Sequence, residues 1–241
     1  MENADAARLR IAAVIPAFNE EQHIADVVRR TRAKIGHVLV VDDGSRDATA
    51  ARAREAGAQV IVHPQNRGKG EAIRTGLRHW LAAGPKKFET GQLARQFEWI
   101  LILDGDAQHR PEEIDRFIAA ARSSAEPRLI LGNRMNDVSA MPFVRRVVNR
   151  YMSRRISRLC SQQIPDTQCG FRMLHRHVIP ELLNGADRFD YETEMLIVAS
   201  QKGFRIDSVA ISTVYSDEIS SIHPLRDTVR FLKLLRRYRQ L

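Results

Sequence analysis

The sequence predicts an α/β fold with one mostly parallel central sheet, and two observations support this class. Short apolar runs alternate with segments of helical periodicity through the first half of the chain. Polar clusters directly follow three of these runs, and the carboxyl ends of parallel strands share one edge of a sheet. At 241 residues, the chain can bury a full core within a single domain.

Four apolar runs account for the expected strands of the first half. The first run is stopped by Pro16, which cannot donate to a strand ladder. The second run ends in Asp42-Asp43-Gly44-Ser45 and the fourth in Asp104-Gly105, and both sequences are typical of turns. We expect these strands over 11–15, 38–41, 60–62 and 99–103.

Helices fill the intervals between these strands. The segment after Pro16 places Ile24, Val27 and Val28 at helical spacing, and Asn19 is positioned to cap this helix. Gly57 is suited to end the next helix, because glycine readily adopts a left-handed conformation. We expect helices over 20–35, 48–56 and 70–83, followed by a surface loop over 84–98.

The second half is less regular and contains two strongly basic segments. We expect helices over 111–123, 142–161 and 191–202, strands over 128–131 and 205–214, and a turn over 165–170. A basic amphipathic helix is expected over 223–241. Residues 1–9 are expected to form a flexible tail, which leaves 10–222 as the single folded domain.

The charge balance indicates anionic partners. A net charge of +9 and a pI of about 10.1 suit nucleotides, phospholipid surfaces or nucleic acid. Nucleic acid is the weakest of these, because aromatic residues make up only 6% and no stacking platform is interleaved with the basic residues. The two cysteines, Cys160 and Cys169, fit a reducing cytoplasm, and no apolar run reaches the roughly 18–20 residues that span a bilayer.

The residues Asp104-Gly105-Asp106 suggest a metal site. Two carboxylates two positions apart after an apolar strand can turn toward one hard cation, and Gln108 adds a neutral oxygen at the same period. Mg²⁺ or Mn²⁺ prefers such oxygen ligands, and a bound diphosphate would complete the coordination. The alternative is an ordinary turn before a helix that starts at Pro111.

Two further clusters fit a nucleotide. A carboxylate of Asp42 or Asp43 could accept hydrogen bonds from a ribose or base, although both residues are also ordinary turn formers. Residues 66–70, with Lys69 between two glycines, resemble a phosphate cradle but lack the spacing of a P-loop. We interpret this segment as a loop that edges the nucleotide.

Five ordered motifs carry a resemblance to a known family. Together they resemble those of family 2 glycosyltransferases, and in particular the branch of dolichol- and polyprenyl-phosphate sugar synthases. The resemblance covers residues 10–230 and implies a GT-A fold, inversion at the anomeric carbon and a divalent metal. The motifs are VIPAFNE at 14–20, VDDGS at 41–45, LDGDAQH at 103–109, PDTQCGFR at 165–172 and YETEML at 191–196.

The resemblance also assigns roles to individual residues. It implies that the nucleoside contacts Pro16, Ala17, Glu20 and Asp43, with Asn19 in the same motif. It implies that Asp104, Asp106 and Gln108 hold the metal and the diphosphate. It places phosphate-binding arginines at Arg134, Arg145 and Arg146, and acceptor-side acids at Asp166 and Glu192.

The expected reaction transfers a hexose from a GDP- or UDP-linked donor to an acceptor. A polyprenyl phosphate is already anionic and needs positioning more than deprotonation, whereas a sugar hydroxyl would need Asp166 or Glu192 as a base. The many arginines favour the phosphate and an anionic membrane surface on the cytoplasmic side. The basic helix over 142–161 could instead pack on the domain through its apolar stripe, which consists of Val147, Val148, Tyr151, Ile156 and Leu159.

Two other classes of protein compete with this interpretation. A sugar-phosphate nucleotidyltransferase typically carries a glycine-rich basic loop after its first strand, where this chain has PAFNE at 16–20. A basic nucleic-acid-binding module has no need for three polar, mostly acidic clusters on one sheet edge. Both alternatives therefore fit the sequence less well than a glycosyltransferase.

Overall fold

The computed structural model describes residues 9–82, 97–136, 138, 141–183, 191–212 and 238. The basic helix expected over 223–241 and the tail expected over 1–9 lie outside the described residues, except for residues 238 and 9. The surface loop expected over 84–98 also lies outside them, except for its last two residues.

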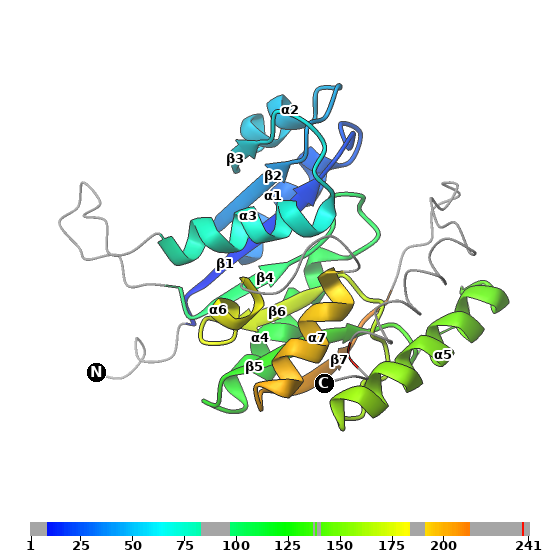
Figure 1. The fold of residues 1–241 in the computed structure, drawn as a ribbon. Coiled ribbons are helices and arrows are strands. Elements are labelled where there is room, and N and C mark those ends of the chain that lie inside the picture. The colour runs from blue at the N-terminus through cyan, green and yellow to red at the C-terminus, as the bar shows by residue number, and fades with distance from the viewer. Residues whose placement is uncertain are drawn as a thin grey trace.

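The described strands form one seven-stranded sheet in the order β3-β2-β1-β4-β6-β5-β7 (Figure 1). Only β6 runs against its neighbours, so the prediction of a mostly parallel sheet is confirmed. The strands are β1 (Ile11–Ala17), β2 (His37–Asp42), β3 (Gln59–Val62), β4 (Trp99–Ile102), β5 (Arg128–Asn133), β6 (Arg172–His175) and β7 (Arg205–Ala210).

Helices cover both faces of the sheet, which explains why β1 and β4 are apolar throughout. Every residue of β1 and of β4 is buried, as is usual for strands with helices on both sides. One face carries α1 (Ile24–Lys34) and, after the short turn η1 (Pro111–Glu113), α4 (Ile114–Arg122) (Figure 1). The other face carries α3 (Lys69–Ala82), α6 (Ile179–Leu183) and α7 (Tyr191–Gln201).

Two helices lie outside these layers. The short α2 (Thr49–Glu55) packs beside β2 and β3. The long α5 (Phe143–Cys160) packs against α7 at the side of the molecule (Figure 1). The buried face of α5 consists of Asn149, Ser153, Ile156 and Cys160. The alternative in which the helix packs on the domain through its apolar stripe holds for Ile156, which is buried, and for Leu159, which packs against the core. It does not hold for Val147, Val148 and Tyr151, whose side chains are exposed.

The register of the sheet brings the polar clusters to one edge, as the sequence predicts. Ala17 at the end of β1 pairs with Asp42 at the end of β2, which in turn pairs with Val62. On the other side of β1, β4 runs parallel and leads directly into Asp104. Three loops therefore begin at the same edge.

The structure corrects two expectations and adds two elements. The first helix begins at Ile24. The residue before it, His23, occupies the N-cap position and makes no side-chain capping bond, so Asn19 does not cap this helix. The strand expected over 205–214 ends at Ala210 within the described residues. The antiparallel strand β6 and the short helix α6 were not expected.

Candidate functional site

The loops after β1 and β2 are joined by hydrogen bonds at the sheet edge and form one wall of the site. Asn19 has a left-handed backbone with φ 57°, and its side-chain carbonyl accepts a bond of 3.0 Å from the backbone N–H of Arg46. In return, the hydroxyl of Ser45 accepts from the Asn19 N–H at 2.9 Å, and that of Thr49 from Glu20 at 2.8 Å. The capping role that we expected for Asn19 is thus replaced by a bridge between the loops after β1 and β2.

Buried Asp43 adds a third loop to this wall. Its carboxylate accepts from the N–H of Arg67 at 3.0 Å and of Gly68 at 2.7 Å, and it contacts Nδ1 of His63 at 2.7 Å. Thr75 holds the other ring nitrogen of His63 at 3.0 Å. Asp43 therefore shapes the loop that leads into α3.

The lysine that follows this loop lies among acids from two other elements. Nζ of Lys69 is 2.7 Å from Oδ1 of Asp104, after β4, and 3.2 Å from Oε2 of Glu192, in the first turn of α7. Burial alone would lower the pKa of Lys69, but the charges of Asp104 and Glu192 outweigh it and raise that pKa. The sequence predicts Lys69 beside the nucleotide and Glu192 near the acceptor, and in the structure these two side chains are in contact.

Two glycines make this convergence possible. A Cβ at Gly70 would lie 2.8 Å from the Cβ of Tyr191, so glycine lets the start of α3 approach the start of α7. A Cβ at Gly170 would lie 2.7 Å from Oδ2 of Asp104 and 3.0 Å from Oε1 of Glu192. Because this position has no side chain, the loop before β6 passes the charged cluster without displacing its members.

Asp104 and Asp106 have the chemistry of a cation site. Burial is the main cause that raises the pKa of Asp106, and the nearby charge of Asp104 raises it further. In the described part of the chain, no group of three His, Cys, Asp or Glu side chains gathers around one point. The residues present fit Mg²⁺ or Mn²⁺, which often binds through one or two carboxylates together with substrate phosphates. The backbone N–H of Gln108 donates a hydrogen bond to Oδ1 of Asp106 at 3.0 Å.

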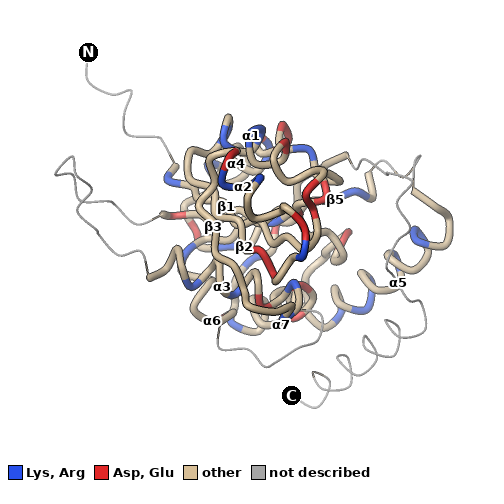
Figure 2. Tube along the Cα trace, turned by 90° about the horizontal axis from the view of Figure 1, so that it is seen from above, with Lys and Arg blue, Asp and Glu red and all other residues tan. Residues whose placement is uncertain are grey.

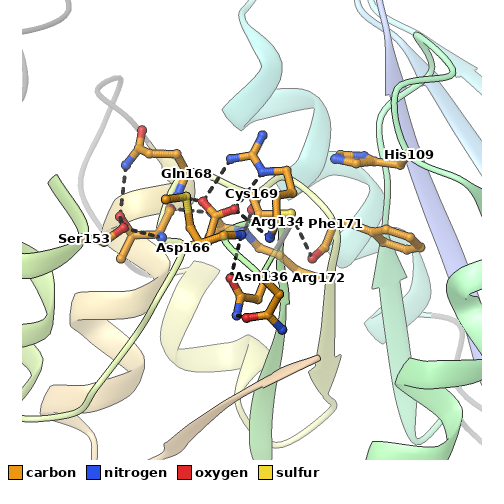
Figure 3. A network of polar contacts seen from close by, with 12 residues as sticks. His109, Arg134, Asn136, Ser153, Asp166, Gln168, Cys169, Phe171 and Arg172 are labelled. Carbon is orange, nitrogen blue, oxygen red and sulfur yellow. Dashed lines mark hydrogen bonds and ion pairs between the residues drawn. The ribbon is translucent and has the colours of Figure 1, made fainter. Parts of the chain in front are cut away.

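A second charged centre joins Arg134 to Asp166 (Figure 3). The guanidinium of Arg134 donates to both oxygens of Asp166, from Nε at 2.7 Å and from Nη2 at 2.9 Å, and its backbone N–H donates at 3.1 Å. Asp166 is fully buried, and its Oδ1 also accepts from the N–H of Gln168 at 3.2 Å. The geometry makes Asp166 a group that orients Arg134, because both of its oxygens are already engaged.

Arg172 links the two centres and was not assigned a role from the sequence. This buried side chain donates to the carbonyl of Cys169 at 2.8 Å, to that of Thr167 at 3.2 Å, and to that of Glu192. It thereby ties the loop before β6 to the first turn of α7. Its charge also helps Lys69 and His109 to lower the pKa of Asp104 against the opposing effect of burial.

The remaining candidates fall into two groups. Pro16, Ala17 and Gly105 line the edge directly, since a Cβ at Gly105 would meet Ile24, Ala17 and the carbonyl of Pro16 within 3.5 Å. Arg145 and Arg146 instead lie half-buried in the first turn of α5, where Arg146 stacks on the ring of Phe143 at 5.4 Å. These two arginines thus belong to the outer helix.

The two cysteines provide no thiol chemistry. Burial raises the pKa of Cys160 to about 11 and that of Cys169 to about 12. Both thiols are therefore protonated near neutral pH.

Comparison with known proteins agrees with this geometry. The family described as "Glycosyl transferase family 2" matches residues 12–183. The UDP-N-acetylglucosamine–dolichyl-phosphate N-acetylglucosaminyltransferase of Methanococcus voltae is 27% identical, over 85% of this chain and 85% of its own length. The undecaprenyl-phosphate 4-deoxy-4-formamido-L-arabinose transferase of Klebsiella pneumoniae is 30% identical, over 74% of this chain and 53% of its own length.

Solved structures show the same fold. Glucosyl-3-phosphoglycerate synthase from Mycobacterium tuberculosis, in complex with Mn²⁺, uridine diphosphate and phosphoglyceric acid, superimposes with a TM-score of 0.66. That match covers 96% of this chain and 78% of the other chain at 18% sequence identity. The GT-A fold that the motifs imply is thereby confirmed.

Proposed function

The chain belongs to glycosyl transferase family 2, and from that premise we propose that it transfers a hexose from a nucleotide-diphosphate sugar to a polyprenyl phosphate, with inversion at the anomeric carbon. The observation that carries this proposal is the convergence of Asp104, Lys69 and Glu192 beside the loops after β1 and β2. An edge with two strand-end carboxylates and a fixed ammonium suits a diphosphate that arrives with a cation.

The donor would lie across the edge of the sheet. Pro16, Ala17, Asn19, Glu20 and the Asp42–Asp43 turn would enclose the nucleoside. Asp104 and Asp106, with Gln108, would hold Mg²⁺ or Mn²⁺, which would offset the charge that develops on the departing nucleoside diphosphate. Lys69 would contribute a further positive charge to the same phosphates.

The acceptor would approach from the side of Arg134. A phosphate nucleophile is already ionised, so it needs a fixed cationic partner more than a base. Bidentate pairing with buried Asp166 gives Arg134 that fixed geometry. The names of the two relatives specify dolichyl-phosphate and undecaprenyl-phosphate, which supports a lipid phosphate here. Arg145 and Arg146 would assist at the entrance to the acceptor site.

A hydroxyl acceptor on a saccharide is the second candidate. It would require a carboxylate that can take a proton. Glu192 is better placed for this than Asp166, because it lies within the charged cluster whereas both oxygens of Asp166 are held.

A lipid acceptor implies work at a membrane. Among the described residues, no helix combines the length and the apolar character needed to cross a bilayer. We propose peripheral attachment on the cytoplasmic face, to which the basic segment over 223–241 would contribute.

The donor can be identified by thermal unfolding. We expect one UDP- or GDP-sugar to raise the Tm in the presence of Mn²⁺ or Mg²⁺ and to lose most of this effect with EDTA, because ligands stabilise the state that binds them. A Tm that responds to none of these sugars, with or without metal, would contradict the proposal.

The acceptor can then be tested directly with that donor. We expect radiolabelled sugar to pass into the organic phase with a polyprenyl phosphate and to remain in the aqueous phase with free saccharides. Inversion gives the product an anomeric configuration opposite to that of the donor. Proton NMR of the sugar 1-phosphate released from the lipid product therefore tests the stereochemistry. Transfer to saccharides alone would contradict the lipid-phosphate acceptor and favour the hydroxyl acceptor.

A further inference from the structure

The outward face of α5 has an unusual pattern for a helix of a folded domain. Val144, Val147, Val148 and Tyr151 follow the spacing of one helical stripe, yet all four side chains are exposed, Val144 at 71%. Phe143 is exposed beside them. Five of the seven large apolar side chains that the described residues expose are therefore gathered on the first half of this helix.

The same stripe becomes basic in the second half of the helix. Arg154, Arg155 and Arg158 continue the spacing of the four apolar residues, and the whole of α5 contains no Asp or Glu (Figure 2). Within the part of the chain that the structure describes, the side chains of Arg150, Arg154, Arg155 and Arg158 form no ion pair. Arg150, Arg154 and Arg158 also line a groove between α5 and residues 163–165.

We propose that α5 docks on an anionic lipid bilayer, with its first turns in the interface and its arginines among the headgroup phosphates. An exposed stripe of valines with a tyrosine, followed by arginines, matches a bilayer whose interior is apolar and whose headgroups are negatively charged. The absence of acids from the helix leaves its positive charge uncompensated there, and an anionic bilayer supplies the complement.

The attachment of α5 links this surface to the candidate site. Oγ of Ser153 accepts from the N–H of Thr167 at 3.0 Å and contacts the Thr167 hydroxyl at 3.2 Å. Ser157 makes a reciprocal pair with the backbone of Ile164, at 3.0 and 3.1 Å. The same loop carries Asp166, which fixes Arg134. If the acceptor is a lipid phosphate, as the proposed function has it, docking of α5 holds the Arg134 side of the site at the headgroups.

A tryptophan placed in the stripe tests the docking directly. Val147→Trp introduces an indole at a position that is 49% exposed, and Val62→Trp places one at a 47% exposed position on β3 as the matched control. The native Trp80 and Trp99 are both buried and add little response. With vesicles of phosphatidylcholine and phosphatidylglycerol, we expect a blue shift for Val147→Trp and quenching by brominated lipid, and neither for Val62→Trp.

Matched charge variants test the role of the arginines. Arg154→Gln/Arg155→Gln/Arg158→Gln removes three charges from α5, and Arg29→Gln/Arg54→Gln/Arg205→Gln removes three from exposed positions elsewhere. We expect the first triple variant to need roughly 10²-fold more anionic lipid for half-maximal co-sedimentation, and the second to behave like wild type. High salt, or vesicles of phosphatidylcholine alone, should weaken the binding of the wild-type protein.

Three outcomes would overturn the proposal. The protein could stay in the supernatant at low salt, or it could sediment with vesicles while the indole at position 147 stays water-exposed and unquenched. Equal losses in the two triple variants would show a general effect of net charge instead. None of these measurements needs turnover, so a failure of docking is distinct from a failure of the proposed function, which the donor-induced Tm shift reports separately.

Discussion

At the scale of single residues, Lys69 holds together acids that would otherwise repel one another. Its ammonium contacts Asp104 and Glu192, and Asp106 follows Asp104 closely at the same strand end. Lys69 is the main influence that lowers the pKa of Asp104 against the effect of burial. The ammonium therefore sits on a carboxylate that the sequence assigns to a divalent cation.

Replacing this ammonium should make the acids more available to metal. In Lys69→Met, we expect Mn²⁺ to bind roughly tenfold more tightly in the absence of donor, a change of about 1.4 kcal/mol, because the competing charge is gone. Calorimetric titration with Mn²⁺ measures this, and Lys202→Met, which breaks a surface pair with Glu181, is the control. Unchanged or weaker Mn²⁺ binding in Lys69→Met would show that the ammonium does not compete with the metal.

The carboxylates themselves should matter for transfer and little for folding. We expect Asp104→Asn and Asp106→Asn to lower transfer by at least about 10²-fold, because each removes a charge from the site where we propose that diphosphate and cation bind. The far-ultraviolet circular dichroism should stay unchanged, since both residues follow the end of β4. Asp115→Asn, at an exposed ion pair on α4, is the control. Full transfer in either variant would show that the substituted carboxylate does not belong to the proposed metal site.

The position of these acids at the sheet edge could be predicted from the sequence because its signal is local. Asp104 and Asp106 follow an apolar run, and a parallel sheet brings such ends to one edge. The contact between Lys69 and Glu192 has no local signal, since it depends on how α3 and α7 pack. For the same reason the sequence left Asp166 open as a base, whereas its pairing with Arg134 is visible only in three dimensions.

At the scale of elements, close approaches decide which side chains meet. The starts of α3 and α7 come together at Gly70 and Tyr191, where the guanidinium of Arg74 also lies 4.4 Å from the centre of the tyrosine ring. The loop before β6 passes Asp104 and Glu192 at Gly170. Side chains at these two glycines would separate elements that the charged cluster needs together.

Gly170→Ala tests this packing. The new methyl group would meet the ends of charged side chains at 2.7–3.1 Å and not backbone, so the fold can adapt while the cluster is displaced. We expect transfer to fall by more than about tenfold, with a Tm change of only a few degrees. Gly36→Ala is the matched control, because a Cβ there meets nothing within 4 Å. If the two variants have equal activity, the close approach at Gly170 is not needed for the reaction.

Elements with a clear period were predictable, and those set by tertiary contacts were not. The strands that became β1 and β4 and the helix α7 were expected close to their observed ends. Strand β6 was missed because its four residues begin with Arg172 and end with His175, although both are buried between β4 and β5. The start of α1 was misplaced because Asn19 bonds to the neighbouring loop instead of to the helix.

At the scale of the whole molecule, folding takes titratable groups out of water in the centre of the sheet. His175 is buried in β6, edge-on to Trp99 with ring centres 4.9 Å apart. Burial, followed by the charges of His177, Arg176 and Arg128, lowers the pKa of His175 to about 4. The folded protein therefore keeps this imidazole neutral at a pH where the unfolded chain would protonate it.

This difference makes stability depend on pH in a defined direction. An unfolded histidine takes up its proton near the ordinary pKa of 6.5, whereas folded His175 does so only near 4. Between these values the unfolded chain binds more protons, so the contribution of His175 to stability is full above pH 6.5 and is lost progressively as the pH falls toward 4.

The variant His175→Phe keeps an aromatic ring against Trp99 but cannot take up a proton. We expect its unfolding free energy to differ less between about pH 5 and about pH 8 than that of the wild type. Urea unfolding of wild type and variant at both pH values measures this, and a variant that loses as much stability on acidification as wild type would show that His175 does not carry the effect.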